Sequence, residues 1–313
     1  MLMKRVTTGI LLILLLAVCC AAAAEGSDTV RYKSVAVDRN TEYVDLGTIS
    51  VTDWQPFYSF LRQLPNLKKI DMYGTVINLK VHQQLEEMFP GLEVNTQIRV
   101  KGRRFRTDIT AFSTLAKEGD NSNLLNYDEV SMLSKRCRKL YALDIGHNRV
   151  KKLDFLYDMP QLRVLIVALC DLTDITPIAS LEHLEYLEIF HNRIADLSPL
   201  ENLRYLMDLD IVKNKVTDLE PLAKIRSLKR LWIYWNNYPE SPSPEQVTML
   251  QEALPGCHID YTSTSTGGGW RKDPHYDVIH TMFRKKTYQP FADSDPENIP
   301  EPWRTERLKQ AEQ

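Results

Sequence analysis

Leucine residues recur at a constant interval of 22 positions through the middle of the chain. Each of these leucines opens a line whose first, fourth and sixth positions are apolar, and the lines begin at Leu140, Leu162, Leu184, Leu206 and Leu228. A spacing of two residues predicts a short strand whose apolar side chains point inward. One repeat cannot bury that side alone, so neighbouring repeats must stack and share it. The pattern therefore predicts a solenoid of parallel strands over residues 140–239.

The second half of each repeat recurs as well. Pro177, Pro199 and Pro221 occupy the same position, and proline there starts a short helical turn because its φ is preset and its missing N–H is not needed. The ninth position of each line is Asn, replaced once by Cys170. In a buried turn, an Asn amide can hydrogen-bond the backbone groups that strand pairing leaves open. We therefore expect strands on the concave face and thin helical turns on the convex face.

Both ends of the regular repeats differ from the middle. Residues 244–254 predict a helix that begins after the N-cap Ser243, and residues 257–261 predict a final strand. Together with a turn at 267–270 they form the expected helix-plus-strand C-terminal cap. The predicted divisions are a signal peptide (1–24), a linker (25–40), divergent N-terminal repeats with a β-hairpin and a connecting helix (41–139), five regular repeats (140–239), the cap (240–291) and a flexible tail (292–313).

The first 24 residues have the layout of a signal peptide. Basic residues precede the apolar run Ile10–Val18, and small residues follow at Ala21–Ala24. Two alternatives are a transmembrane anchor and a lipid anchor on Cys19, although Val18 stands where a lipobox requires a small residue. We expect the protein to leave the cytoplasm and to be secreted or associated with the cell surface.

Composition narrows the class of protein. The 313 residues have a formal net charge of −2, which argues against nucleic acid as the main partner. Beyond the leader, three cysteines remain (Cys137, Cys170 and Cys257), an odd number without CxxC spacing. A disulfide framework is therefore not expected, and the repeated core must hold the fold together.

The lines LxxLxLxx(N/C) are the leucine-rich repeat pattern. The segment 194–203 resembles the 22-residue repeats of internalin-type bacterial proteins. The layout from 41 to 291 resembles secreted leucine-rich repeat proteins of Firmicutes, on the segments 64–72, 146–149, 253–257 and 267–270. The resemblance implies extracellular protein binding and transfers no catalytic residue.

The residues between the framework leucines are expected to face a partner from the concave side. Aromatic and arginine side chains dominate binding hot spots, and neighbouring carboxylates favour a basic partner segment. The nine residues predicted to bind a partner, here called the concave site, are Tyr186, Glu188, Phe190, Asp208, Asp210, Arg230, Trp232, Tyr234 and Trp235. The occupant is a protein or peptide, a glycan that stacks on the rings, or the chain's own C-terminal segment with Trp270 and Tyr288.

Other groups of residues give weaker evidence for a metal site or an active site. His147, Cys170 and His191 lie in neighbouring repeats, but Cys170 points into the solenoid, so the three converge poorly on a metal. The sequence shows no nucleophile elbow and no HExxH, and we predict no catalytic residue, metal or cofactor. A basic cluster at residues 99–106 is either a solvated strand edge or a contact for an anionic wall polymer or phospholipid.

The sequence thus predicts an exported, non-enzymatic recognition protein, a monomer that binds an unidentified extracellular protein or peptide on the concave face of its solenoid. The alternative is a surface protein that binds carbohydrate or a cell-wall polymer.

Overall fold

The computed structural model describes residues 28–114, 124–148, 150–236, 242–262 and 269–311. The predicted signal peptide and the lipid-anchor candidate Cys19 lie outside these residues. Within them, no helix is both long and apolar enough to cross a membrane. The chain forms two compact units, the first from residues up to 76 and 80–96 and the second from residues 77–79 and 97–313.

The first unit is built from short strands and two helices. Its elements are β1 (Thr29–Tyr32), β2 (Val35–Asp38), β3 (Tyr43–Asp45), α2 (Trp54–Leu61), β4 (Lys69–Val76), α3 (Leu79–Met88) and the first half of β5 (Glu93–Val100). Strands β1 and β2 form an antiparallel hairpin, so the expectation of a linker over 25–40 was wrong. Val30 and Tyr32 are buried, and the Tyr32 ring packs edge-on against Phe57 at 5.3 Å.

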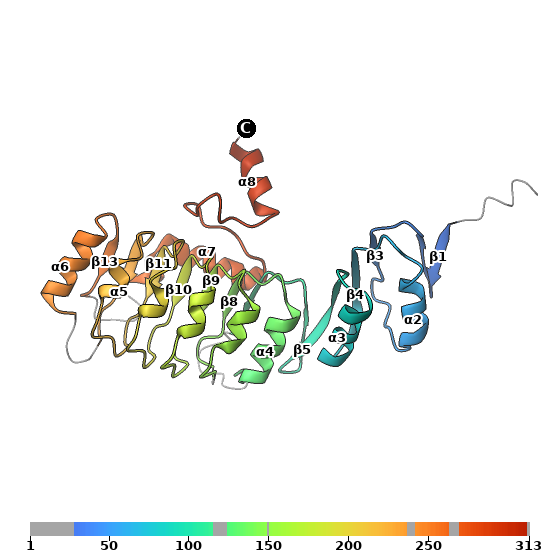
Figure 1. The fold of residues 1–313 in the computed structure, drawn as a ribbon, viewed down its shortest axis with the longest axis horizontal. Coiled ribbons are helices and arrows are strands. Elements are labelled where there is room, and N and C mark those ends of the chain that lie inside the picture. The colour runs from blue at the N-terminus through green and yellow to red at the C-terminus, as the bar shows by residue number, and fades with distance from the viewer. Residues whose placement is uncertain (1–27, 115–123, 149, 237–241, 263–268, 312–313) are drawn as a thin grey trace, which may run out of the picture. The chain divides into compact units, whose positions relative to one another are not determined.

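The second unit holds the solenoid. Seven parallel strands lie side by side in the order β13 to β7, and Figure 1 shows them stacked along the body of this unit. The strands are β7 (Ala111–Ser113), β8 (Ala142–Asp144), β9 (Val164–Ile166), β10 (Tyr186–Glu188), β11 (Asp208–Asp210), β12 (Arg230–Trp232) and β13 (His258–Asp260). The central leucines of β8 to β12 are direct cross-strand neighbours, which confirms the solenoid predicted from the 22-residue interval.

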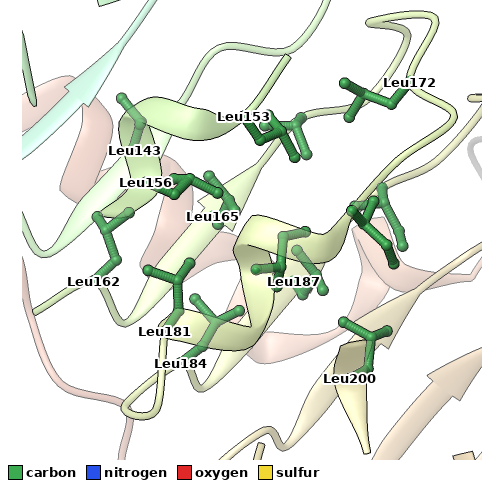
Figure 2. Packing of buried hydrophobic residues seen from close by; sticks show 14 of the residues in the cluster. Leu143, Leu153, Leu156, Leu162, Leu165, Leu172, Leu181, Leu184, Leu187 and Leu200 are labelled. Atoms are coloured by element: carbon green, nitrogen blue, oxygen red, sulfur yellow. The ribbon is translucent and has the colours of Figure 1, made fainter. Parts of the chain in front are cut away.

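The convex side is made of single turns. These are η2 (Asp154–Asp158), η3 (Thr176–Ser180), η4 (Ser198–Leu200) and α5 (Glu220–Ala223), preceded by α4 (Tyr127–Arg136). Leucines from the strands and from these turns point toward one another and fill the interior (Figure 2). Leu143, Leu165 and Leu187 are fully buried, so neighbouring repeats share one continuous core.

The recurring Asn side chains close the turns after the strands, as expected. Asn192 donates from Nδ2 to the carbonyls of Val167 and Ile189, both at 2.9 Å, and its Oδ1 accepts from Cys170 N at 3.0 Å. Cys170 replaces Asn in the second repeat, and its Sγ lies 3.3 Å from the Ile145 carbonyl. The thiol therefore fills the same position with weaker hydrogen bonding.

The C-terminal cap follows the predicted pattern. Helix α6 (Pro244–Ala253) begins with a capping box in which the side chain of Ser243 and that of Gln246 each bond the other's backbone N–H. Strand β13 then pairs with β12 and extends the sheet by one strand.

The chain beyond the cap returns to the solenoid. We call residues 269–311 the C-terminal segment; it contains η5 (Trp270–Lys272), α7 (Pro274–Lys285) and α8 (Trp303–Ala311). Helix α7 lies against the strands on the side opposite the convex turns (Figure 1). The first part of the predicted flexible tail is instead docked, because Ser294, Asn298 and Ile299 are buried, whereas no residue of α8 is buried. The division at residue 292 missed this docking, because two of the three buried side chains are polar.

Candidate functional site

A second hydrophobic core covers the concave face. Strand residues such as Val164 and Tyr186 pack there with Ile279, Met282 and Phe291 from the C-terminal segment. The concave site is therefore not an open surface in this structure. Of the three occupants considered for it, the structure shows the chain's own C-terminal segment.

The aromatic corner is closed by the start of the C-terminal segment. Trp232 and Tyr234 are buried, and Trp235 is half-buried. Gly269 lies so close to Trp232 that a Cβ at this glycine would stand 2.8 Å from the indole. The next residue, Trp270, packs on Phe190 with ring centroids 5.3 Å apart. These rings form a packed aromatic cluster in which the segment supplies the second layer.

Further along the face, the segment places two more rings on the strands. Phe291 lies 6.4 Å from the ring of Tyr186 and stacks on His275, with centroids 4.1 Å apart and planes 14° apart. Tyr186 is fully enclosed, and burial raises the pKa of its phenol well above the ordinary value. The hydroxyl therefore remains protonated and lies 3.5 Å from Glu188.

Charged residues of the strands and of the segment form one network. Arg230 donates to both carboxylate oxygens of Asp208, the cross-strand neighbour on β11. His275 bridges two carboxylates, with Nδ1 2.7 Å from Asp208 and Nε2 2.8 Å from Asp293. Burial of these groups is tolerated because each charge has an opposite charge beside it.

Part of this network has the composition of a metal site. Asp208, Asp273 and His275 offer ligand atoms within 4.8 Å of one another, the one such group found in the described part of the chain. However, the Arg230 guanidinium bonds Asp208 and lies 3.7 Å from Asp273. This cation already supplies the positive charge that a metal would bring. The cluster is better described as an ion-pair network.

A column of carboxylates runs beneath the segment, and these acids form no ion pair within the part of the chain that the structure describes. Glu188 and Asp210 are direct neighbours on β10 and β11, and Asp144 lies two strands before Glu188 in the same column. Burial raises the pKa of Asp144 to about 6 and that of Glu188 to about 8, where Asp144 adds to the effect. Burial and the Glu188 charge also raise the pKa of Asp210. These acids can be protonated near neutral pH.

A polar clamp holds the last part of the segment. Asn298 donates from Nδ2 to Glu185 at 2.7 Å and to the His183 carbonyl at 3.0 Å. Ser294 donates to the second oxygen of Glu185 at 2.8 Å, and Arg163 donates to the Asn298 carbonyl at 2.9 Å. Each carboxylate oxygen of the buried Glu185 thus accepts a hydrogen bond from the segment.

The structure brings together all nine residues of the concave site, but it adds residues that the sequence analysis did not select. Arg163 and Glu185 directly follow framework leucines, a column that was not read as part of the face. His275, Asp293 and Asn298 lie outside the repeats, where no periodicity marks them. The sequence signal that could have pointed to the C-terminal segment was Glu185. An acidic side chain directly after a framework leucine is expected to be buried and therefore needs a polar partner.

Comparison with protein families supports the repeat pattern. The family model described as Leucine Rich repeats (2 copies) matches residues 160–202. No curated protein matches the chain. An internalin from Listeria monocytogenes is 19% identical, with 73% of this chain and 51% of that chain covered and a TM-score of 0.37. A leucine-rich repeat protein from Leptospira interrogans is 21% identical, with 64% and 50% covered and a TM-score of 0.40.

A third solved structure is the Arabidopsis thaliana receptor kinase HAESA ectodomain, in complex with a peptide hormone. It is 16% identical, with 64% of this chain and 33% of that chain covered and a TM-score of 0.33. The chain spans about half the length of the first two structures. The match over 160–202 and the seven-stranded parallel sheet together identify the chain as a leucine-rich repeat solenoid.

Proposed function

We propose that this chain is an exported, non-enzymatic recognition protein that binds a protein or peptide partner through the concave site. One observation supports this proposal most strongly: the face already holds a polypeptide, the C-terminal segment. Its ring contacts at Phe190 and Tyr186 and its charged contact at Asp208 are those expected of a peptide groove. An outside polypeptide with aromatic and basic residues fits the same chemistry.

The partner and the C-terminal segment then compete for one face. A partner binds only the fraction of molecules in which the segment has left, so its apparent affinity is lowered by that fraction. A partner with better contacts to the same rings displaces the segment. In this proposal the segment keeps a large apolar groove covered until such a partner arrives.

A carbohydrate or cell-wall polymer is the second candidate, since sugar rings stack on aromatic side chains. Trp232 and Tyr234 are enclosed by protein, and Asp208 beside them contacts His275 of the C-terminal segment. A neutral glycan offers no basic group to replace that contact, so the chemistry of the face favours a polypeptide.

Export is part of the proposal and rests on the basic, apolar and small-residue pattern of residues 1–24. Outside the cytoplasm, the partner is an extracellular protein or peptide. The proposal requires one copy of the chain for each partner.

Competition provides the test of this function. A protease site placed in residues 263–268 allows the C-terminal segment to be cut from the solenoid after folding. Intact and cut chains are immobilised and exposed to cell-envelope proteins, and the bound fraction is eluted with a synthetic peptide of residues 269–299. We expect the cut chain to capture more of one protein than the intact chain does. We also expect the peptide of residues 269–299 to release that protein.

The matched control carries Trp232→Ala, which removes a ring of the concave site. Loss of capture by this variant, with an unchanged circular dichroism spectrum, supports the proposal. A protein that the peptide does not release, or equal capture by intact and cut chains, contradicts binding at the concave site. Release by soluble glycan in place of the peptide favours the carbohydrate alternative.

A further inference from the structure

The hairpin of β5 and β6 (Arg103–Arg106) carries an unusual density of positive charge. Residues 97–106 contain five basic side chains and no acidic one, in a chain whose net charge is −2. All five basic side chains are exposed. The cluster is therefore a local feature and does not follow from the composition of the chain.

The pairing of the two strands places like charges opposite each other. Arg99 on β5 is the direct antiparallel partner of Arg104 on β6. Like charges directly opposite each other destabilise a sheet. Edge protection explains basic residues on β6, which ends its sheet. It does not explain Arg99, because β5 is not an edge strand.

Nearby acidic residues neutralise only part of the hairpin. Lys101 lies 3.2 Å from Glu129 and Arg106 lies 2.6 Å from Asp108. Among the residues that the structure describes, no ion pair is recorded for Arg99, Arg103 or Arg104. Three guanidinium groups thus face solvent with their hydrogen-bond donors available.

The C-terminal segment places another cation near the hairpin, but on its other side. The Lys286 carbonyl accepts from the backbone N–H groups of Thr110 and Ala111 at 3.4 Å. The Lys286 ammonium group lies 4.9 Å from the centre of the Phe105 ring. Phe105 points to the opposite face of β6 from its neighbours Arg104 and Arg106, so the exposed arginine face belongs to the hairpin alone.

We propose that the exposed face of the β5–β6 hairpin binds a linear phosphate-bearing polyanion. Guanidinium groups offer paired donors that match phosphate oxygens. Arg99 and Arg104 are direct cross-strand partners, about 5 Å apart. Arg106 lies on the same face of β6 but donates to Asp108, so the pair of Arg99 and Arg104 supplies the donors that can contact neighbouring phosphates of an extended chain.

The shape of the hairpin favours a soluble polymer over a bilayer. Peripheral membrane sites combine basic residues with apolar side chains that enter the interface. Here the turn is formed by Lys101 and Gly102, both exposed and neither able to insert. The one aromatic residue of β6, Phe105, packs against Phe112 at 5.2 Å. The hairpin offers charge without an apolar anchor.

The test is a titration of the full chain with inorganic polyphosphate, followed by fluorescence anisotropy of labelled protein at increasing salt. We expect saturable binding that weakens steeply as salt rises, because condensed counterions are released. Arg99→Gln with Arg104→Gln should weaken binding about tenfold or more. The matched control is Arg31→Gln with Arg62→Gln, which removes two exposed charges from the first unit and should leave binding unchanged.

Vesicles of phosphatidylglycerol and phosphatidylcholine form the second arm of the test. No binding to polyphosphate, or equal binding by the hairpin variant and the native chain, overturns the proposal. Tighter binding to the vesicles than to polyphosphate, at equal phosphate concentration, overturns the choice of a linear polymer. None of these outcomes depends on the concave site, so this proposal and the proposed function can fail separately.

Discussion

The side-chain amide of Asn298 donates to the carboxylate of Glu185 at 2.7 Å, across 113 residues of chain. Both residues are 1% exposed, and burial raises the pKa of Glu185 while the bonds from Ser294 and Asn298 oppose that rise. This contact ties the C-terminal segment to the third regular repeat. The closure of the concave face therefore depends on specific polar pairs as well as on apolar packing.

Replacing Asn298 should loosen the segment. In Asn298→Ala, Glu185 loses one donor and the His183 carbonyl loses another, which leaves buried acceptors unsatisfied at a cost of about 1–3 kcal/mol. We expect faster amide hydrogen exchange over residues 286–299, with little change in the strands β8 to β12. Asn202→Ala, at an exposed position of the convex side, is the control. Equal exchange in the two variants would show that the clamp does not hold the segment.

The close approach of Gly269 to Trp232 gives a second prediction. An added Cβ at Gly269 would lie 2.8 Å from the indole and 2.9 Å from a carboxylate oxygen of Asp260. Gly269→Ala should therefore destabilise the docked segment by about 1–3 kcal/mol, seen as faster proteolytic release of the segment. At Gly256 the nearest described atom is more than 4 Å from an added Cβ, so Gly256→Ala should behave like the native chain. If Gly269→Ala is released no faster, the segment is not seated on Trp232 as described.

Buried Glu188 should make the stability depend on pH. Burial raises its pKa from 4.5 to about 8, so the folded chain holds a proton that the unfolded chain releases. The stabilisation is complete below pH 4.5, declines as pH rises, and is lost above about 8, with a slope of about 1.4 kcal/mol per pH unit. In the variant Glu188→Gln the side chain at this position cannot ionise, so this contribution to the pH dependence is removed.

The measurement is the free energy of unfolding in urea for the native chain and for Glu188→Gln across this pH range. Asp144 and Asp210 titrate in both chains, and the Glu188 charge acts on Asp210, so the difference reports Glu188 together with its effect on that neighbour. We expect that difference to shift in favour of the Gln variant as pH rises. A difference that does not change with pH would place Glu188 in contact with solvent.

The buried Asn positions of the repeats allow a graded test. Asn192→Ala removes three donated bonds and leaves the N–H groups of Cys170 and Leu172 without their acceptor. We expect a loss of about 3 kcal/mol in the free energy of unfolding. Asn192→Cys should cost less, because the Cys170 thiol fills the same position. Equal losses for both substitutions would mean that the thiol contributes nothing there.

The repeats could be predicted because one physical requirement recurs. Each of the strands β8 to β12 must place a leucine such as Leu165 or Leu187 in the shared core, and this requirement recurs every 22 residues. The cap was predictable for a local reason, since Ser243 and Pro244 mark a helix start without reference to the rest of the chain. The β1–β2 hairpin was missed because each strand has only four residues.

The sequence allowed the C-terminal segment to be named as one of three occupants of the concave site, but it gave no reason to choose the segment over the other two. Its contacts join residues far apart in the sequence, such as Arg163 with Asn298 and Asp208 with His275. Polar pairs of this kind leave no periodic signal. The residues of the concave site were identified because they alternate with framework leucines, but that alternation does not reveal what covers them.

The central claim is that the concave site recognises a polypeptide and that the chain's own segment is the one bound. The most direct test cuts the chain within residues 263–268, separates the released segment by dilution, and titrates a labelled peptide of residues 269–299 back onto the solenoid. The account predicts saturable binding that Phe190→Ala weakens at least about tenfold, through loss of its contact with Trp270. A folded solenoid that does not bind the peptide, or binds it equally well without the Phe190 ring, would contradict the claim.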